Sequence, residues 1–129
     1  MRGFFAIAAL ALGACYALDE GRQQSWTKQT PLSSPDVAQR ANAHLRRAGY
    51  QVLHSDDRLT EAEKQRDGGR FDVLRVIVEG AGGDGTRVRV QAVTEEGSAG
   101  GRKESRSASS TALTDGQALV DALTTAGGL

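Results

Sequence analysis

Cysteine is almost absent from this chain, because Cys15 is the only one among 129 residues. A single thiol cannot form an internal disulfide, and an odd cysteine indicates a modified group, a reactive thiol or a link between chains. Aromatic residues are also scarce, at 5% of the sequence. A core with so few aromatic side chains must be built mainly from Val, Leu and Ala, and we expect it to be thin and marginally stable.

Net charge is also lacking. The sequence has 16 Lys and Arg against 16 Asp and Glu, so its formal net charge is zero. This balance gives no electrostatic case for binding nucleic acid, and it provides no polybasic patch for an anionic membrane surface. We therefore expect no nucleic-acid partner.

The first residues carry the strongest local pattern. Met1 and Arg2 are followed by an apolar run, Gly3 to Gly13, and then by small residues. This order is typical of a secretory signal peptide. A membrane-spanning helix would need about 20 apolar residues, which is more than the run provides. A buried N-terminal helix is the third alternative, and the missing polar face disfavours it. We expect residues 1–14 to be a signal peptide.

The end of that segment reads Leu12, Gly13, Ala14, Cys15. It resembles the lipobox of bacterial lipoproteins, in which leucine and two small residues precede an obligatory cysteine. The resemblance covers only the first 15 residues. It implies diacylglycerol on the Cys15 sulfur, cleavage after Ala14 and acylation of the new amino group. Two or more acyl chains anchor a protein stably, so we expect membrane attachment through Cys15. Tyr16, in place of aspartate, resembles outer-membrane sorting signals, with the domain facing the periplasm or the outside.

Residues 15–33 are polar and show no clear period. They predict a lipidated tether ahead of one small domain at 34–129. Trp26 is the exception within this segment. One interpretation is that Trp26 docks onto the domain, because burial must offset the entropy lost when a chain is ordered. The other is that Trp26 is an anchor for a protein partner, and it is our candidate interaction residue.

Two helices are expected in the domain. Residues 34–36 supply a capping serine, a first-turn proline and an aspartate, which together predict a helix over 35–48. Thr114 and Gln117 fit a capping box and predict a second helix that begins at Thr114. Glycines at 127–128 are expected to end it.

Alternating apolar residues predict strands at 50–55, 71–79 and 86–94. Residues 58–66 fit either a further strand or a helical turn. Residues 95–112 are rich in Gly, Ser and charge, and they predict a flexible loop. Short turns between strands imply an antiparallel meander, and the amphipathic helices must cover one of its faces. We expect an α+β fold: a small two-layer sandwich with three or four antiparallel strands and two helices on one face.

Few residues suggest catalysis. The glycines at 80–85 match GxGxxG, but a strand rather than a helix follows them, so they favour a hairpin. His54 lies beside Ser55, Asp56 and Asp57, yet sequence neighbours seldom assemble a triad, and no GxSxG motif is present. His44 is the second histidine, and the two lack the tight spacing of a metal site. We expect no catalytic residue, cofactor or metal.

Three functional hypotheses remain. Elimination favours a non-enzymatic interaction or structural module with a protein partner at the cell envelope. The second is a domain that binds a small apolar ligand or lipid, in a cavity between helices and sheet lined by Val, Leu and Phe71. The third is a hydrolase that uses His54 with Asp56 or Asp57, in an exposed pocket beside that turn.

Overall fold

The computed structural model describes residues 23–83, 85–98, 101–105 and 107–125. The predicted signal peptide, the lipidation site Cys15 and the glycines at 127–128 lie outside the described residues. No helix in the described part of the chain has the length and apolar character needed to cross a bilayer.

The described residues form an α+β fold, as predicted, with six strands in one antiparallel sheet rather than three or four. The elements are, in order, β3 (Gln23–Thr30), α2 (Ser34–Arg47), β4 (Gln51–Ser55), β5 (Leu59–Arg66), the short 3-10 helix η1 (Asp67–Gly69), β6 (Arg70–Gly82), β7 (Gly85–Ser98), β8 (Gly101–Glu104) and α3 (Ser110–Thr124). The sheet order is β3-β7-β6-β5-β4, and β8 pairs with the far end of β7.

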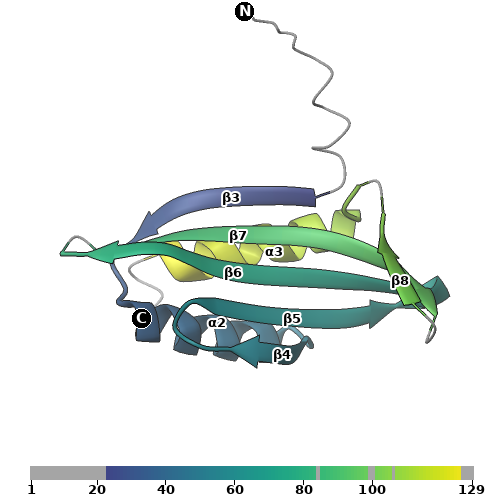
Figure 1. Ribbon diagram of the computed structural model, residues 1–129, viewed down its shortest axis with the longest axis horizontal. Helices are drawn as coiled ribbons and strands as arrows, with labels where there is room; N and C mark the ends of the chain where they lie inside the picture. The colour runs from purple at the N-terminus through teal and green to yellow at the C-terminus, as the bar shows by residue number, and fades with distance from the viewer. Residues whose placement is uncertain (1–22, 84, 99–100, 106, 126–129) are drawn as a thin grey trace, which may run out of the picture.

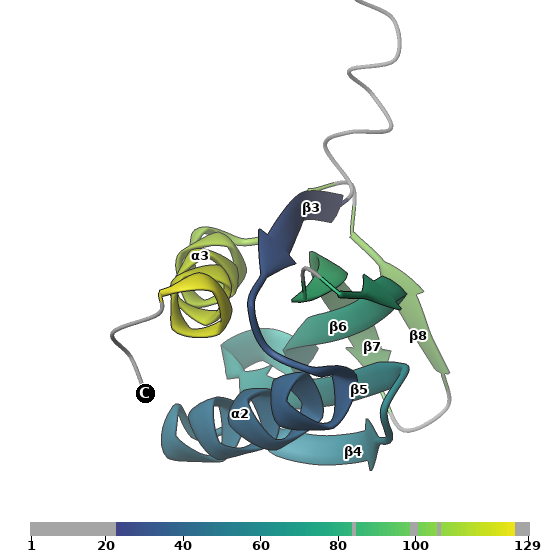
Figure 2. The ribbon, with the colours of Figure 1, turned by 90° about the vertical axis from the view of Figure 1, so that its left-hand side faces the viewer.

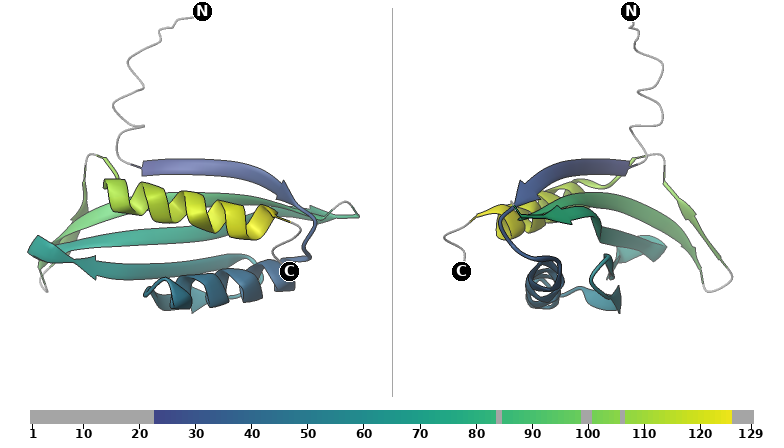
Figure 3. Two further views of the ribbon diagram at one scale, coloured as in Figure 1. Left: turned by 180° about the vertical axis from the view of Figure 1, so that it is seen from behind. Right: turned by 60° about the vertical axis from the view of Figure 1, so that its left-hand side comes forward.

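Both helices cover the same face of the sheet (Figures 1 and 3). The edge-on view shows the two helices on one side, with β8 curling towards the other side (Figure 2). The core between the two layers is mostly Val, Leu and Ala, in keeping with the composition. Its largest fully buried side chains include Leu45, Leu74, Val76, Val90, Leu119 and Leu123.

Helix α2 forms almost where the sequence predicts it. Its N-cap is Ser33, whose side chain accepts a hydrogen bond from the Asp36 N–H at 3.3 Å. Val37, Ala41 and Leu45 are buried, which is the four-residue spacing expected for one face of a helix. Residues 59–66, for which the sequence fitted either a strand or a helical turn, form strand β5. The glycines at 80–85 form the β6–β7 hairpin, as predicted.

The predicted tether is corrected at residues 23–30, which form strand β3. This strand pairs with β7 in an unbroken register from Gln23 to Thr30. The polar sequence of β3 gave no strand pattern, because an edge strand with one face in solvent needs few apolar side chains. Trp26 and Thr30 supply its main buried contacts. The sheet therefore begins at Gln23 rather than after residue 33.

The predicted flexible loop at 95–112 is also corrected. Strand β7 continues to Ser98, and β8 pairs back onto it. The hairpin between β7 and β8 requires glycine at position 97, because a Cβ there would overlap the carbonyl oxygen of Gly101. Helix α3 begins at Ser110 rather than Thr114, since the side chain of Ser109 accepts a hydrogen bond from the Ala112 N–H at 3.1 Å. Segments that lack a period can thus still be ordered by pairing and capping.

Candidate functional site

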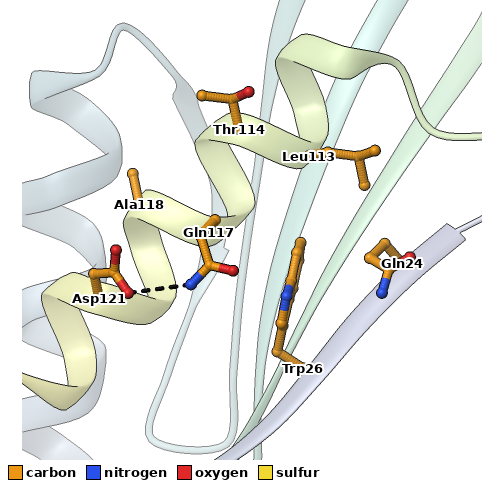
Figure 4. Close-up of a pocket in the computed structure, with 7 residues that line it drawn as sticks. All are labelled: Gln24, Trp26, Leu113, Thr114, Gln117, Ala118 and Asp121. Carbon is orange, nitrogen blue, oxygen red and sulfur yellow. Dashed lines mark hydrogen bonds between the residues drawn. The ribbon is translucent and has the colours of Figure 1, made fainter.

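A shallow groove of about 520 Å³ runs between edge strand β3 and helix α3 (Figure 4). Its surface is mostly apolar, and the groove is largely open to solvent. The lining residues are Gln24, Trp26, Leu113, Thr114, Gln117, Ala118 and Asp121. Two come from the strand and five from the helix, so the groove exists only because β3 packs beside α3. We call it the Trp26 groove.

The Trp26 ring lies against α3 where the helix has a glycine. A Cβ added at Gly116 would lie 2.7 Å from Cζ3 and 2.8 Å from Cη2 of the indole, and 3.3 Å from the Cβ of Ala92. Ordinary carbon–carbon contacts are about 3.5–4.0 Å. Gly116 therefore permits the close approach of strand and helix. The indole is only partly buried, and it stands between the two elements within the groove (Figure 4).

The groove has an acidic end. Gln117 Nε2 donates a hydrogen bond to Asp121 Oδ1 at 3.1 Å, and both side chains are exposed. Asp121 forms no ion pair with any described residue. Leu113 lies towards the other end of the groove, beside Gln24 (Figure 4). An occupant would therefore meet apolar surface at Trp26 and Leu113, and a negative charge at Asp121.

A buried carboxylate fixes the start of α3, and hence one end of the groove. Asp72 on β6 is fully buried. It accepts hydrogen bonds from the hydroxyls of Thr111 (2.6 Å), Ser109 (2.8 Å) and Thr94 (3.2 Å), and from Arg66 Nε at 2.8 Å. Burial alone would raise the pKa of Asp72, but these hydrogen bonds outweigh it and hold the pKa below its usual value.

The same network continues to Tyr50, in the loop between α2 and β4. Arg66 Nη2 donates to Asp115 Oδ2 at 2.9 Å, and the Tyr50 hydroxyl donates to the same oxygen at 2.8 Å. Burial raises the pKa of Tyr50, and the hydrogen bond to Asp115 raises it further. This network could not be predicted from the sequence, because its members lie in β5, β6, β7, α3 and the loop between α2 and β4. It holds the groove-forming helix in place and contains no open reaction site.

The structure brings His54 and Asp56 together, as the hydrolase hypothesis requires. His54 Nε2 lies 2.8 Å from Asp56 Oδ2, and each side chain is 51% exposed. Asp56 Oδ1 also accepts hydrogen bonds from the backbone N–H of Arg58 (2.8 Å) and Leu59 (2.9 Å). The Arg58 N–H, His54 and the Leu59 N–H together lower the pKa of Asp56 to about 2. The Asp56 carboxylate thus closes a turn.

A nucleophile is not placed beside this pair. The Ser55 hydroxyl hydrogen-bonds with Asn42 (2.5 Å) and Thr60 (3.1 Å) instead. Among the described residues, no hydroxyl or thiol hydrogen-bonds to the other ring nitrogen of His54. Asp57 lines a separate polar pocket of about 390 Å³ that His54 does not line. The geometry is that of a solvated turn rather than a catalytic triad.

The second histidine, His44, lies apart on helix α2 and is partly buried. Burial and the nearby Arg47 lower its pKa, while Asp115 opposes them. Within the described residues, no three His, Cys, Asp or Glu side chains cluster closely enough to hold a metal ion.

Phe71 does not line a cavity between the helices and the sheet. Its neighbour Asp72 points into that space, whereas the Phe71 ring lies on the opposite face, 3.5 Å beneath the Arg102 guanidinium. Arg102 also reaches Glu63 at 2.6 Å and Glu95 at 3.3 Å. Arg102 thus links β8 to β5, β6 and β7 at the curled end of the sheet. Packed core residues occupy the space between the two layers.

No protein-family model matches the chain, and a search of curated proteins finds no match. The geometry of the Trp26 groove and the N-terminal sequence are therefore the observations that bear on function.

Proposed function

We propose that this chain is a non-enzymatic, lipid-anchored interaction module of the bacterial cell envelope, and that it binds a protein partner at the Trp26 groove. The supporting observation is the indole of Trp26, which is partly exposed in a mostly apolar groove. Tryptophan is among the residues that most often dominate the energy of protein interfaces. Asp121 at one end adds a charge that can fix the partner's orientation.

The proposed anchor constrains where the partner lies. Residues 16–22 separate Cys15 from Gln23, the first residue of strand β3. The eight residue steps from Cys15 to Gln23 span at most about 28 Å when the chain is fully extended. A lipid on Cys15 would therefore keep the groove close to the membrane surface, and the partner is expected to be another envelope component. We propose the outer membrane as the site, with the domain facing the periplasm or the outside.

The groove fits a macromolecule better than a small ligand. Pockets for small molecules bury most of the ligand surface, whereas the Trp26 groove is largely open to solvent. Among the described residues that line it, Asp121 is the only ionisable one, so these residues provide no pair of groups for acid and base catalysis. Ligand carriage and hydrolysis are therefore less well supported than protein binding.

The test is crosslinking in cells of the full-length protein, tagged after Leu129, followed by mass spectrometry of the membrane fraction. Ala118→Arg places a long charged side chain in the groove at an exposed helix position. Ala43→Arg makes the same change on exposed surface of α2 and serves as the matched control. Cys15→Ser removes the proposed lipid site.

The proposal predicts one partner recovered at near-equal amount with the wild type and with Ala43→Arg. It predicts loss of that partner with Ala118→Arg and release from the membrane with Cys15→Ser. Recovery of the same partner with Ala118→Arg would overturn the assignment of the groove. A soluble wild-type protein that retains Met1 would overturn the lipid anchor.

A further inference from the structure

Among the described residues, no strand pairs with the outer edge of β3, and the positions of its outward-facing backbone groups follow from the register. At the edge of β7 that pairs with β3, the Thr94 carbonyl oxygen accepts a hydrogen bond from the Ser105 N–H at 2.8 Å. Backbone direction alternates along a strand, so the even-numbered residues of β7 face β3. Trp26 is paired with Val90 and therefore bonds to β7. The intervening residues of β3 point their N–H and C=O groups outward; these include Ser25, Thr27 and Gln29.

The two edges of the sheet differ in how well they are protected. The opposite edge is strand β4, which has five residues and an irregular register between Val52 and His54. Short length and bulges are common ways to protect an edge from pairing. Strand β3 has eight residues in regular register with β7. Of the two, β3 is the edge at which a further strand can pair.

The Trp26 groove lies directly beside this edge. Gln24 and Leu113 share one end of it, and the Thr30 hydroxyl donates to the Leu123 carbonyl at 2.6 Å beyond the other. Helix α3 and strand β3 therefore run in the same direction (Figure 3). A strand added outside β3 would point every second side chain to the helix side, along the groove. Backbone pairing and side-chain pockets would then act together.

We propose that the occupant of the Trp26 groove is an extended segment of a protein partner, which adds to the sheet as a strand outside β3. This inference rests on the proposed function and names its mode of recognition. Alternate apolar side chains of the segment lie over Trp26 and Leu113, and a basic side chain pairs with Asp121. Backbone hydrogen bonds to Thr27 and its outward-facing neighbours supply the pairing, as in other examples of strand addition.

A second copy of the chain fits this edge less well. Antiparallel pairing of two β3 strands about a two-fold axis would also set the two α3 helices antiparallel. The Asp121 end of one groove would then face the Leu113 end of the other. This arrangement places a carboxylate against apolar surface, and no Lys or Arg is among the described residues that line the groove. An extended segment of a partner can place an apolar side chain at the Leu113 end of the groove and a basic side chain at the Asp121 end.

The test uses the full-length lipidated protein, purified in detergent, and a displayed library of random peptides. Thr27→Pro removes the outward N–H, and proline is tolerated on an edge strand when that N–H faces solvent. Thr27→Ala changes the same side chain but keeps the N–H, and it is the matched control. Circular dichroism and urea unfolding check that both variants fold. Hydrogen exchange at Ser25, Thr27 and Gln29 of the wild type gives a readout that needs no variant.

We expect the selected peptides to alternate apolar residues and to carry a basic residue. Thr27→Pro should weaken their binding at least about tenfold, and Thr27→Ala by less than about twofold. The outward amides should exchange quickly in the free protein and slowly in the complex. Asp121→Asn should weaken the basic peptides and leave the alternating pattern unchanged.

Several outcomes would overturn the inference. These are equal binding to Thr27→Pro and Thr27→Ala, amides that stay unprotected in the complex, or failure to select any peptide. Protection of the same amides by vesicles of phosphatidylethanolamine and phosphatidylglycerol would make the surface a membrane contact. Protection that rises with protein concentration would make it a dimer contact. If crosslinking finds a partner at the groove while the amides stay unprotected, the proposed function stands and strand addition fails.

Discussion

The contact between Trp26 and Gly116 predicts that a single methyl group on α3 destabilises the domain. Two opposing effects decide the sign. Alanine is more favourable than glycine inside a helix by about 1 kcal/mol. However, the new Cβ would lie 2.7 Å from the indole ring, which is about 1 Å inside ordinary contact. Overpacking of this kind costs about 1–3 kcal/mol. We therefore expect Gly116→Ala to lower the free energy of unfolding by about 1 kcal/mol.

The sign should reverse when the ring is removed. In a Trp26→Ala background the methyl group loses the contact with the indole and keeps only the 3.3 Å approach to the Cβ of Ala92. The helix preference for alanine should then dominate, and Gly116→Ala should raise the free energy of unfolding by up to about 1 kcal/mol. Urea unfolding of the full chain measures both changes, as the two arms of a double-mutant cycle. Circular dichroism is the appropriate signal, because Trp26 is the only tryptophan. Ala43→Gly on α2 is the control, and it should cost about 1 kcal/mol in either background.

Equal stabilisation of the wild type and of Trp26→Ala by Gly116→Ala would contradict this prediction. That result would mean that the indole does not pack on the helix at this position. The walls of the Trp26 groove would then need another description. A destabilisation of equal size in both backgrounds would show instead that a group other than Trp26 meets the new methyl.

Other predictions concern the polar network around Asp72 and the contacts of Arg102 on β8. Asp72→Asn should cost about 3 kcal/mol at neutral pH, since it breaks a buried ion pair. Because folding lowers the pKa of Asp72, its carboxylate contributes to the free energy of unfolding above about pH 4, and this contribution is lost as the pH falls through the folded pKa. The free energy of unfolding of Asp72→Asn, measured with urea, should therefore depend less on pH in the acid range than that of the wild type. Because folding raises the pKa of Tyr50, its neutral hydroxyl contributes to the free energy of unfolding below about pH 10, and this contribution is lost as the pH rises through the folded pKa. The free energy of unfolding of Tyr50→Phe should therefore depend less on pH in the alkaline range. Arg102→Ala should uncover Phe71 and speed amide exchange in β8, while exchange in α2 stays unchanged.

Elements with strong local signals could be predicted from the sequence. Helix α2 carries a cap, a first-turn proline and a regular apolar face, and β6 and β7 carry long apolar patterns. Strand β3 could not be predicted, because its pairing with β7 links residues far apart in the chain. The start of α3 was missed for a similar reason. Ser109 caps the helix while also bonding to Asp72 on a distant strand.

The candidate site was predicted in part. Trp26 could be singled out as a large apolar residue within a polar segment. Its packing partner Gly116 could not, because a glycine inside a helix gives no sign of which ring lies on it. The outward-facing backbone of β3 follows only from the register with β7. Local sequence thus identifies an anchor residue, and tertiary pairing decides what surrounds it.

The most direct test of the proposed binding surface is site-specific photo-crosslinking in cells. A photoreactive amino acid would replace Gln117 in the Trp26 groove and, as a control, Gln39 on the exposed side of α2. We expect one protein to be crosslinked from position 117, to be absent from position 39, and to be lost when Ala118→Arg is added. Identical crosslinks from both positions, or none from position 117 in a membrane-bound protein, would contradict it.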